Sequence, residues 1–119
     1  MTEMDSISSL NERIVKSFLD LYILQLLSES PRWGFDIIVE AKKKFGVTLS
    51  PGAIYPLLYA LEESGYVTGT WDSPVRRSKK IYQITQKGHE YLNAAWKTIN
   101  LTLEGLQSKP VLKTEFAQA

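Results

Sequence analysis

Apolar residues recur at helical spacing in the first half of the chain. Residues 11–28 are apolar on one side at first and then almost all round, which predicts a helix whose second half forms the spine of the core. Residues 1–8 are polar, and we expect them to be frayed. The Ser30-Pro31 step breaks the first helix. Residues 34–45 predict a second helix that ends at Gly46, with an inner face made of Phe35, Ile38, Val39 and Phe45.

Residues 51–64 carry the clearest helical signal. Ser50 can accept hydrogen bonds from the first-turn N–H groups, Pro51 suits the first helical position, and Gly65 suits a left-handed stop. The predicted buried stripe steps by three and four residues through Ile54, Leu57, Leu58 and Leu61. The opposite face is left with Ala53, Tyr55, Pro56, Tyr59, Ala60 and Glu63. The pattern predicts an amphipathic third helix whose outer face includes two tyrosines.

The pattern changes to that of strands after Gly65. Residues 66–71 and 80–85 alternate or carry β-branched and aromatic side chains, and Asp72-Ser73-Pro74 between them is typical of a turn. The connection also carries a basic run, made of Arg76, Arg77, Lys79 and Lys80. Three helices followed by a hairpin with a positively charged tip is the layout of a winged helix-turn-helix, in which the hairpin is the wing.

A fourth helix is expected from the cap at Thr85 to about Leu106. Its apolar positions step by four, three, four and three residues, which is the spacing of a coiled-coil seam: Leu92, Trp96, Ile99, Leu103 and Leu106. The predicted fold class is mainly α with a small β-hairpin, a winged helix-turn-helix with a C-terminal dimerisation helix. We expect a DNA-binding domain over residues 1–85, the dimerisation helix over 86–107, and a tail over 108–119.

Composition limits the classes of function that remain open. The 119 residues are 44% hydrophobic and include no cysteine, which excludes disulfides, thiolate catalysis and zinc sites built on Cys. No apolar run approaches the roughly 20 residues of a membrane span, and the N-terminus lacks signal-peptide features, so we expect a cytoplasmic protein. The formal net charge is only +1, but residues 31–80 hold eight Lys and Arg against five Asp and Glu. Charge therefore permits DNA binding without requiring it.

No arrangement suited to catalysis is visible in the sequence. Enzymes need a nucleophile with its base, paired carboxylates or a metal cluster. His89 is the single histidine and stands beside Glu90 in the first turn of the fourth helix, while the neighbours Glu62 and Glu63 point to different sides of a helix. We therefore expect no enzyme activity, no cofactor and no metal site.

Several ordered motifs resemble the PadR family of transcriptional regulators, over about residues 18–92. The most specific match is the third helix, with Ser50-Pro51-Gly52, Tyr55-Pro56 and Leu61-Glu62. Further matches are Leu19-Asp20-Leu21, Leu26-Leu27-Ser28-Glu29, Trp33-Gly34-Phe35-Asp36-Ile37, Trp71, the basic run, Tyr82, Thr85, Gly88 and Tyr91-Leu92. The chain departs from the family pattern at Phe35, where a Tyr is usual, at Ala60, where many members carry Arg or His, and at Ile81, which replaces a common aromatic residue.

The resemblance implies a repressor that acts as a homodimer through the last helix. It also implies that a planar aromatic small molecule can act as effector, because some members sense phenolic acids or bind flat aromatic drugs at the dimer interface. We expect the homodimer to bind a pseudo-palindromic operator in double-stranded DNA, with the third helix in the major groove.

The candidate contacts to DNA lie on the third helix and the wing. The wing cations could bind DNA phosphates or enter a minor groove, and the two tyrosines could contact phosphates or base edges. The start of the third helix could approach the DNA backbone. The full set is Ser50, Pro51, Ala53, Tyr55, Tyr59, Arg76, Arg77, Lys79 and Lys80. Lys42, Lys43 and Lys44 close the second helix, where cations stabilise the carbonyl end whatever the function.

The sequence leaves two alternative functions open. Trp96 is either a large residue of the helix seam or a stacking platform for a planar ligand. The near-neutral charge and Ala60 favour a winged-helix protein-interaction module, and Trp96 would serve a small-molecule-binding protein with weak DNA binding. The dependence of DNA affinity on salt separates these classes from a DNA-binding regulator.

Overall fold

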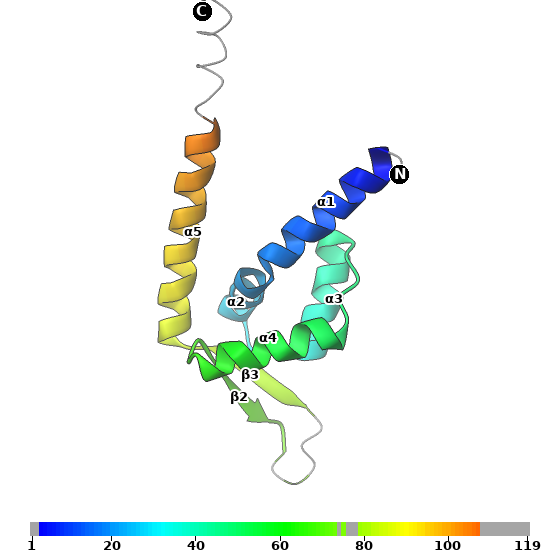
Figure 1. Ribbon diagram of the computed structural model, residues 1–119. Coiled ribbons are helices and arrows are strands. Elements are labelled where there is room, and N and C mark those ends of the chain that lie inside the picture. The colour runs from blue at the N-terminus through cyan, green and yellow to red at the C-terminus, as the bar shows by residue number, and fades with distance from the viewer. Residues whose placement is uncertain (1–2, 74, 76–78, 108–119) are drawn as a thin grey trace, which may run out of the picture.

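The computed structural model describes residues 3–73, 75 and 79–107, and these form the winged helix-turn-helix that the sequence predicts. The elements in chain order are α1 (Glu3–Ser17), α2 (Leu19–Glu29), β1 (Arg32–Trp33), α3 (Gly34–Phe45), α4 (Pro51–Glu63), β2 (Val67–Trp71), β3 (Lys80–Ile84) and α5 (Gln86–Gln107). Figure 1 shows α2, α3 and α4 packed together in the centre of the molecule, with the hairpin of β2 and β3 at one end. Helices α1 and α5 extend away from the hairpin in diverging directions.

The first helix differs from the prediction of one helix over residues 11–28. The structure has two, because Phe18 leaves helical geometry with φ −104° and ψ 11°. The Phe18 N–H is shared between the carbonyl oxygens of Ile14 and Val15, at 3.3 and 3.2 Å, which is a tightened helix end. Residues 3–8 of the start that we expected to be frayed are helical instead, because α1 begins at Glu3, while residues 1 and 2 lie outside the described residues. No Gly or Pro interrupts residues 3–17, so polar character alone does not stop a helix there.

The core is centred on α2, as the sequence predicts for the second half of the first helix. The largest fully buried side chains are Ile23, Leu24, Leu26, Ile37, Ile54, Leu58 and Val67. In α3 the inner face is rotated from the predicted one: Ile37 and Ala41 are fully buried, while Phe35 is 53% exposed. Ala41 is small enough to let α3 approach its neighbours closely. The prediction missed it because the pattern was drawn from large apolar residues.

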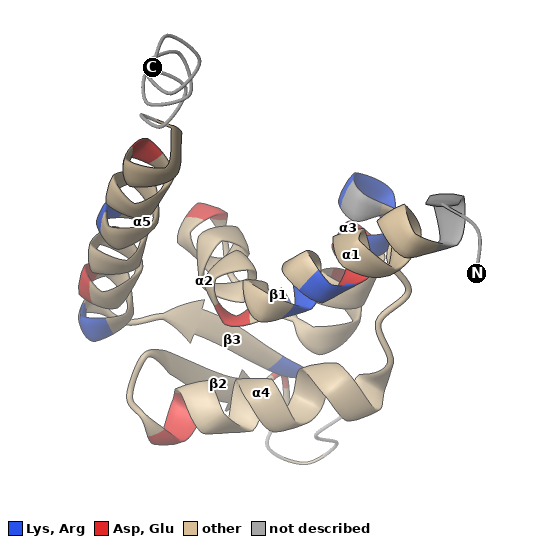
Figure 2. Ribbon diagram, turned by 45° about the horizontal axis from the view of Figure 1, so that its top comes forward, with Lys and Arg blue, Asp and Glu red and all other residues tan. Residues whose placement is uncertain are grey.

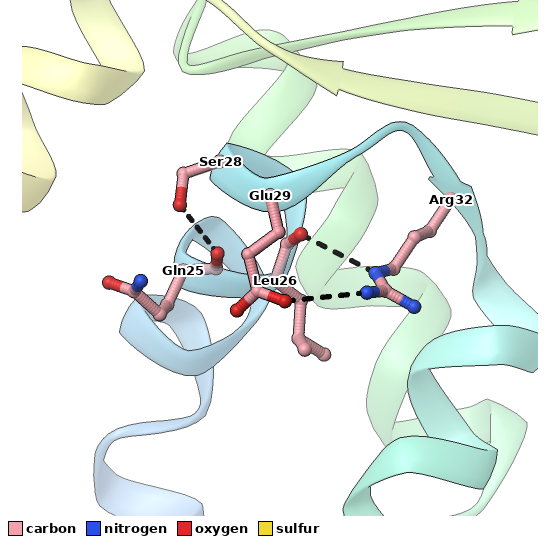
Figure 3. Close-up of polar contacts among 5 residues, drawn as sticks. All are labelled: Gln25, Leu26, Ser28, Glu29 and Arg32. Atoms are coloured by element: carbon pink, nitrogen blue, oxygen red, sulfur yellow. Dashed lines mark hydrogen bonds and ion pairs between the residues drawn. The ribbon is translucent and has the colours of Figure 1, made fainter.

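A short strand, β1, was not predicted. Two residues are too few to show strand periodicity, yet β1 extends the hairpin to a sheet of order β1-β3-β2, with Arg32 opposite Tyr82 and Trp33 opposite Ile81. Arg32 also ties this strand to the end of α2 (Figure 3): its Nε donates to the Leu26 carbonyl at 3.4 Å, and its Nη2 lies 3.6 Å from Glu29 Oε1.

The predicted boundaries of α4 are confirmed, and Ser50 stands at the predicted N-cap position, but not with the predicted side-chain hydrogen bond. The Ser50 side chain makes no capping hydrogen bond; the Ser50 carbonyl accepts from Ala53 and Ile54 N–H groups at 3.0 and 3.2 Å. Gly65 has the expected left-handed backbone, with φ 82°. Ile54, Leu58 and Leu61 are buried and the predicted outer face is exposed, so α4 presents both tyrosines to solvent.

Helix α5 begins at the predicted cap. Thr85 Oγ1 accepts from the Gly88 N–H at 3.0 Å and donates to the Gly65 carbonyl at 2.6 Å. Along the predicted seam, Leu92 is buried in the chain's own core and Ile99 is packed against it, whereas Trp96, Leu103 and Leu106 are 37%, 44% and 66% exposed. Within the described residues, no helix combines the length and apolar character needed to cross a membrane.

Candidate nucleic-acid interface

The exposed face of α4 and the wing open onto one cleft of about 560 Å³. Residues from β1, α3, α4, β2 and β3 line it: Trp33, Gly34, Tyr55, Tyr59, Trp71, Lys79, Lys80 and Tyr82. The structure therefore brings together the two tyrosines and two of the wing lysines that the sequence selected. Sequence reasoning did not place Trp33, Trp71 and Tyr82 here. The register puts Tyr82 opposite Gly69, two residues before Trp71, so Tyr82 and Trp71 share one face of the sheet. Trp33 lies opposite Ile81 and lines the cleft from the N-cap position of α3.

Tyr55 lies across the start of α3. A Cβ at Gly34 would stand 2.5 Å from Tyr55 Cε1 and 2.8 Å from its hydroxyl oxygen, so Gly34 leaves the room that the ring occupies. Tyr55 is 41% exposed and Tyr59, one turn further along α4, is 64% exposed. Both rings are thus free to meet a partner from solvent, and Tyr55 is held in place by its contact with α3.

Lys80 is turned inward, unlike the predicted phosphate contact. Its Nζ lies 2.8 Å from Glu62 Oε1 and 5.5, 5.9 and 5.5 Å from the ring centroids of Tyr59, Trp71 and Tyr82. The hydrogen bond that Lys80 donates to Glu62 raises the pKa of Lys80, so this ammonium stays charged. Because the carboxylate neutralises it locally, Lys80 adds little positive potential at the surface.

Lys79 is the described wing cation that remains at the surface. It is exposed, and its Nζ lies 4.4 Å from the ring centroid of Trp33, a cation–π distance. Val75, at 90% exposure, also belongs to the wing. The predicted contacts Arg76 and Arg77 lie outside the described residues.

The start of α4 is exposed and carries no side-chain charge. Ser50, Pro51 and Ala53 are exposed there, and in Figure 2 the acidic colour on α4 is confined to its C-terminal end, at Glu62 and Glu63. An uncharged helix N-terminus is suited to an anion such as phosphate, because the positive end of the helix dipole lies there. The face of α4 that the cleft exposes is therefore neutral and aromatic, with its cations supplied by the wing.

A second, strongly apolar pocket of about 380 Å³ lies between α1, α2 and α5. Its lining is Ile14, Val15, Phe18, Tyr22, Gln25, Trp96, Ile99 and Leu103. The Trp96 indole N–H donates to Gln25 Oε1 at 3.1 Å, which fixes one edge of the ring. Sequence reasoning identified Trp96 and missed its partners on α1 and α2, although the apolar side of α1 at Leu10, Ile14 and Phe18 was visible.

Known proteins share the sequence pattern and the fold of this chain. Residues 23–94 match the model of the PadR-like family of transcriptional regulators. No curated protein matches the chain significantly. A PadR family regulator from Eggerthella lenta DSM 2243 superposes with a TM-score of 0.75 at 23% identity, over 87% of this chain and 91% of that one, and at this identity it shows the fold.

Two Bacillus structures are closer in sequence. A PadR-like regulator from Bacillus cereus strain ATCC 14579 is 28% identical over 79% of this chain and 95% of its own, with a TM-score of 0.63. Bacillus subtilis PadR in complex with operator DNA is also 28% identical, over 66% of this chain but only 45% of its own, with a TM-score of 0.59. Because the family match spans more than half of the chain, this protein belongs to the PadR-like family, whose members are transcriptional regulators and not enzymes.

Proposed function

We propose that this chain is a homodimeric repressor that binds a pseudo-palindromic operator in double-stranded DNA. The observation that carries the proposal is the shared cleft: the exposed face of α4 and the wing cation Lys79 open toward the same side. In this arrangement α4 enters the major groove and the wing follows the flanking backbone. Bacillus subtilis PadR, which is 28% identical over 66% of this chain, forms a complex with operator DNA, and this supports DNA as the partner.

The contacts divide by chemistry. Tyr55 and Tyr59 reach phosphate or base edges from α4, and the start of α4 at Ser50, Pro51 and Ala53 approaches the backbone. Lys79, with Arg76 and Arg77, neutralises phosphates and so makes the affinity depend on salt. Lys80 is left out of this set because Glu62 binds its ammonium.

The dimer is assigned to the exposed apolar faces of α5 and α1. Leu103 and Leu106 on α5, and Ile7, Leu10 and Ile14 on α1, are between 44% and 66% exposed. Apolar side chains repeated along two helices favour pairing with a second copy. Residues 1–85 then form the DNA-binding domain and 86–107 the dimerisation helix, and the two α4 helices must stand about 34 Å apart to meet successive major grooves.

The apolar pocket at Trp96 favours a second element of the proposal, a planar aromatic effector. The pocket lies between α5 and the helices α1 and α2 of the proposed DNA-binding domain. A ligand that fits one spacing of the two domains better than another shifts the affinity for DNA by that difference. A repressor that blocks a promoter acts where the chromosome is, so we place the protein in the cytoplasm.

Fluorescence anisotropy tests DNA binding directly. The purified chain is titrated against duplexes that tile the DNA immediately upstream of its own coding sequence, with a scrambled duplex as control, at two salt concentrations. We expect tight, salt-sensitive binding to one upstream duplex and weak binding to the control. Equal weak binding to both, without salt dependence, would instead favour a winged-helix module that binds another protein.

A further inference from the structure

Glu62 joins α4 to the wing through both of its carboxylate oxygens. Oε1 accepts from Lys80 Nζ at 2.8 Å, and Oε2 accepts from the Gly69 backbone N–H at 3.1 Å. Glu62 stands at the end of α4, Gly69 in the middle of β2 and Lys80 at the start of β3. One side chain therefore holds three elements, and it is partly shielded, with 31% of its surface exposed.

The Gly69 N–H is available to Glu62 because β2 is the edge of the sheet. The strand order is β1-β3-β2, and Asp72 donates to the Lys79 carbonyl at 2.8 Å. Hydrogen-bonded and non-bonded residue pairs alternate along an antiparallel ladder. Gly69, three positions before Asp72, therefore directs its N–H away from β3, and Glu62 satisfies a donor that the sheet itself cannot reach.

The same arrangement leaves no room for a side chain at position 69 while Lys80 keeps its place. A Cβ there would overlap Lys80 Cε and would stand 3.1 Å from both Glu62 Oε2 and Tyr82 Cε1. The absence of a side chain lets Lys80 cross the strand toward Glu62, over the rings of Tyr59 and Tyr82. Aromatic rings thus flank the contact and shield part of it from water, which strengthens a charge pair relative to one in open water.

We propose that Glu62 is a positioning residue for DNA binding, which fixes the wing relative to the exposed face of α4. The inference rests on the proposed function, because the wing and α4 must meet the backbone and the groove at the same time. Holding two contact elements in their bound arrangement lowers the entropy lost on binding. Glu62 acts through Lys80 and Gly69 and does not itself contact DNA.

The proposal predicts an effect opposite in sign to simple electrostatics. Glu62→Gln removes a negative charge near the DNA-binding face and releases the Lys80 ammonium, so Coulomb attraction alone would raise the affinity for DNA. If Glu62 positions the wing, the same change lowers the affinity, because the wing cations no longer reach their phosphates. Glu63→Gln is the matched control: it makes the same change of charge at the adjacent, exposed residue of α4.

The experiment measures binding of the full chain to a mixed-sequence DNA duplex at several salt concentrations, with circular dichroism confirming that each variant is folded. We expect Glu62→Gln to weaken binding about fivefold and to lower the salt slope by about one unit, the equivalent of one lost phosphate contact. Glu63→Gln should bind as tightly as the wild type or more tightly. An unchanged salt slope with lower thermal stability would assign Glu62 a merely structural role and overturn the inference.

Lys80→Met breaks the same contact from its other side and carries the test alone if Glu62→Gln is unfolded. It should also weaken binding and lower the slope. Where both single variants fold, the double variant Glu62→Gln with Lys80→Met should lose no more than the worse single variant, because the pair acts as one unit. If Glu62→Gln raises the affinity for DNA, Lys80→Met lowers it and the two changes cancel in the double variant, the residues act only through their charges, and the inference is overturned. A wild type that binds the duplex while Glu62→Gln binds more tightly overturns this inference alone; a wild type that binds no DNA overturns the proposed function with it.

Discussion

Gly88 lies directly against the backbone of Tyr66, so that a Cβ at position 88 would overlap the Tyr66 carbonyl oxygen. The same oxygen accepts the Thr85 N–H at 3.0 Å. The first turn of α5 is therefore docked on the residue that precedes β2. Through this contact, the position of α5, the proposed dimerisation helix, is tied to that of the wing.

Gly88→Ala should destabilise the fold by about 1–3 kcal/mol, because the backbone of Tyr66 cannot move aside as a flexible side chain can. Gly105→Ala in the same helix is the control. No heavy atom lies within 4 Å of a Cβ there, and the better helix propensity of Ala should add up to about 1 kcal/mol. Urea unfolding followed by circular dichroism measures both. Equal stability of Gly88→Ala and the wild type would show that α5 can shift away from Tyr66.

Charges at the end of the α5 seam should separate the proposed dimer. Leu103→Glu with Leu106→Glu places two carboxylates on exposed apolar positions, and we expect light scattering to report half of the wild-type mass with an unchanged circular dichroism spectrum. Leu101→Glu is the control, because Leu101 is 60% exposed on another side of α5 and should leave the dimer intact. A dimer that survives both seam substitutions would place the interface on α1.

The wing should contribute affinity through charge. Lys79→Ala is expected to weaken binding to all DNA sequences alike and to reduce the slope of log affinity against log salt by about 0.9, the value for one phosphate contact. Lys16→Ala removes an exposed cation from α1, far along the chain from the wing, and should leave the slope unchanged. If both variants reduce the slope equally, the effect comes from the net charge of the protein, and Lys79 makes no specific contact with DNA.

Much of this fold follows from the sequence because helix ends and faces depend on neighbouring residues. Gly46 and Gly65 adopt the left-handed backbone where the pattern placed them, and the Thr85 cap forms as expected. The break at Phe18 was not foreseen, because the apolar pattern runs on through it without Gly or Pro. Such a break is decided by how α1 and α2 pack, which is tertiary information.

The site was predictable in its elements and less so in its contacts. The spacing of Tyr55 and Tyr59 places them on the outer face of α4, and the structure confirms it. Lys80 looked like one more wing cation, since a run of charges does not show which member turns inward. Its partner Glu62 precedes it by 18 residues, and only the register of β2 against β3 brings the two together.

Alkaline pH should weaken the fold through Tyr82. Burial raises the pKa of this tyrosine, so the folded state keeps the phenol proton while the unfolded state loses it near pH 10. The contribution of Tyr82 to the free energy of unfolding is therefore fully present below the ordinary tyrosine pKa, and it is lost as the pH rises toward the raised value. The raised pKa of Lys80 acts in the same direction, because its charged form is favoured by the fold.

Tyr82→Phe should reduce the loss of stability between about pH 8 and about pH 10.5, measured as the urea midpoint. Tyr59→Phe removes an exposed hydroxyl from the same cleft and should keep the wild-type pH dependence. Identical pH dependence in the wild type and Tyr82→Phe would mean that other groups govern alkaline unfolding.

A planar aromatic effector should report its position through Trp96. We expect acridine orange to quench the tryptophan fluorescence of the wild type, because the apolar pocket presents one side of the indole while Gln25 holds its N–H. Trp96→Phe should lose most of this quenching. Trp71→Phe is the control, since Trp71 lines the cleft beside α4 instead and its loss should leave the quenching in place. If Trp71→Phe abolishes the quenching and Trp96→Phe does not, the dye binds in the cleft beside α4, and the pocket between α1, α2 and α5 serves packing alone.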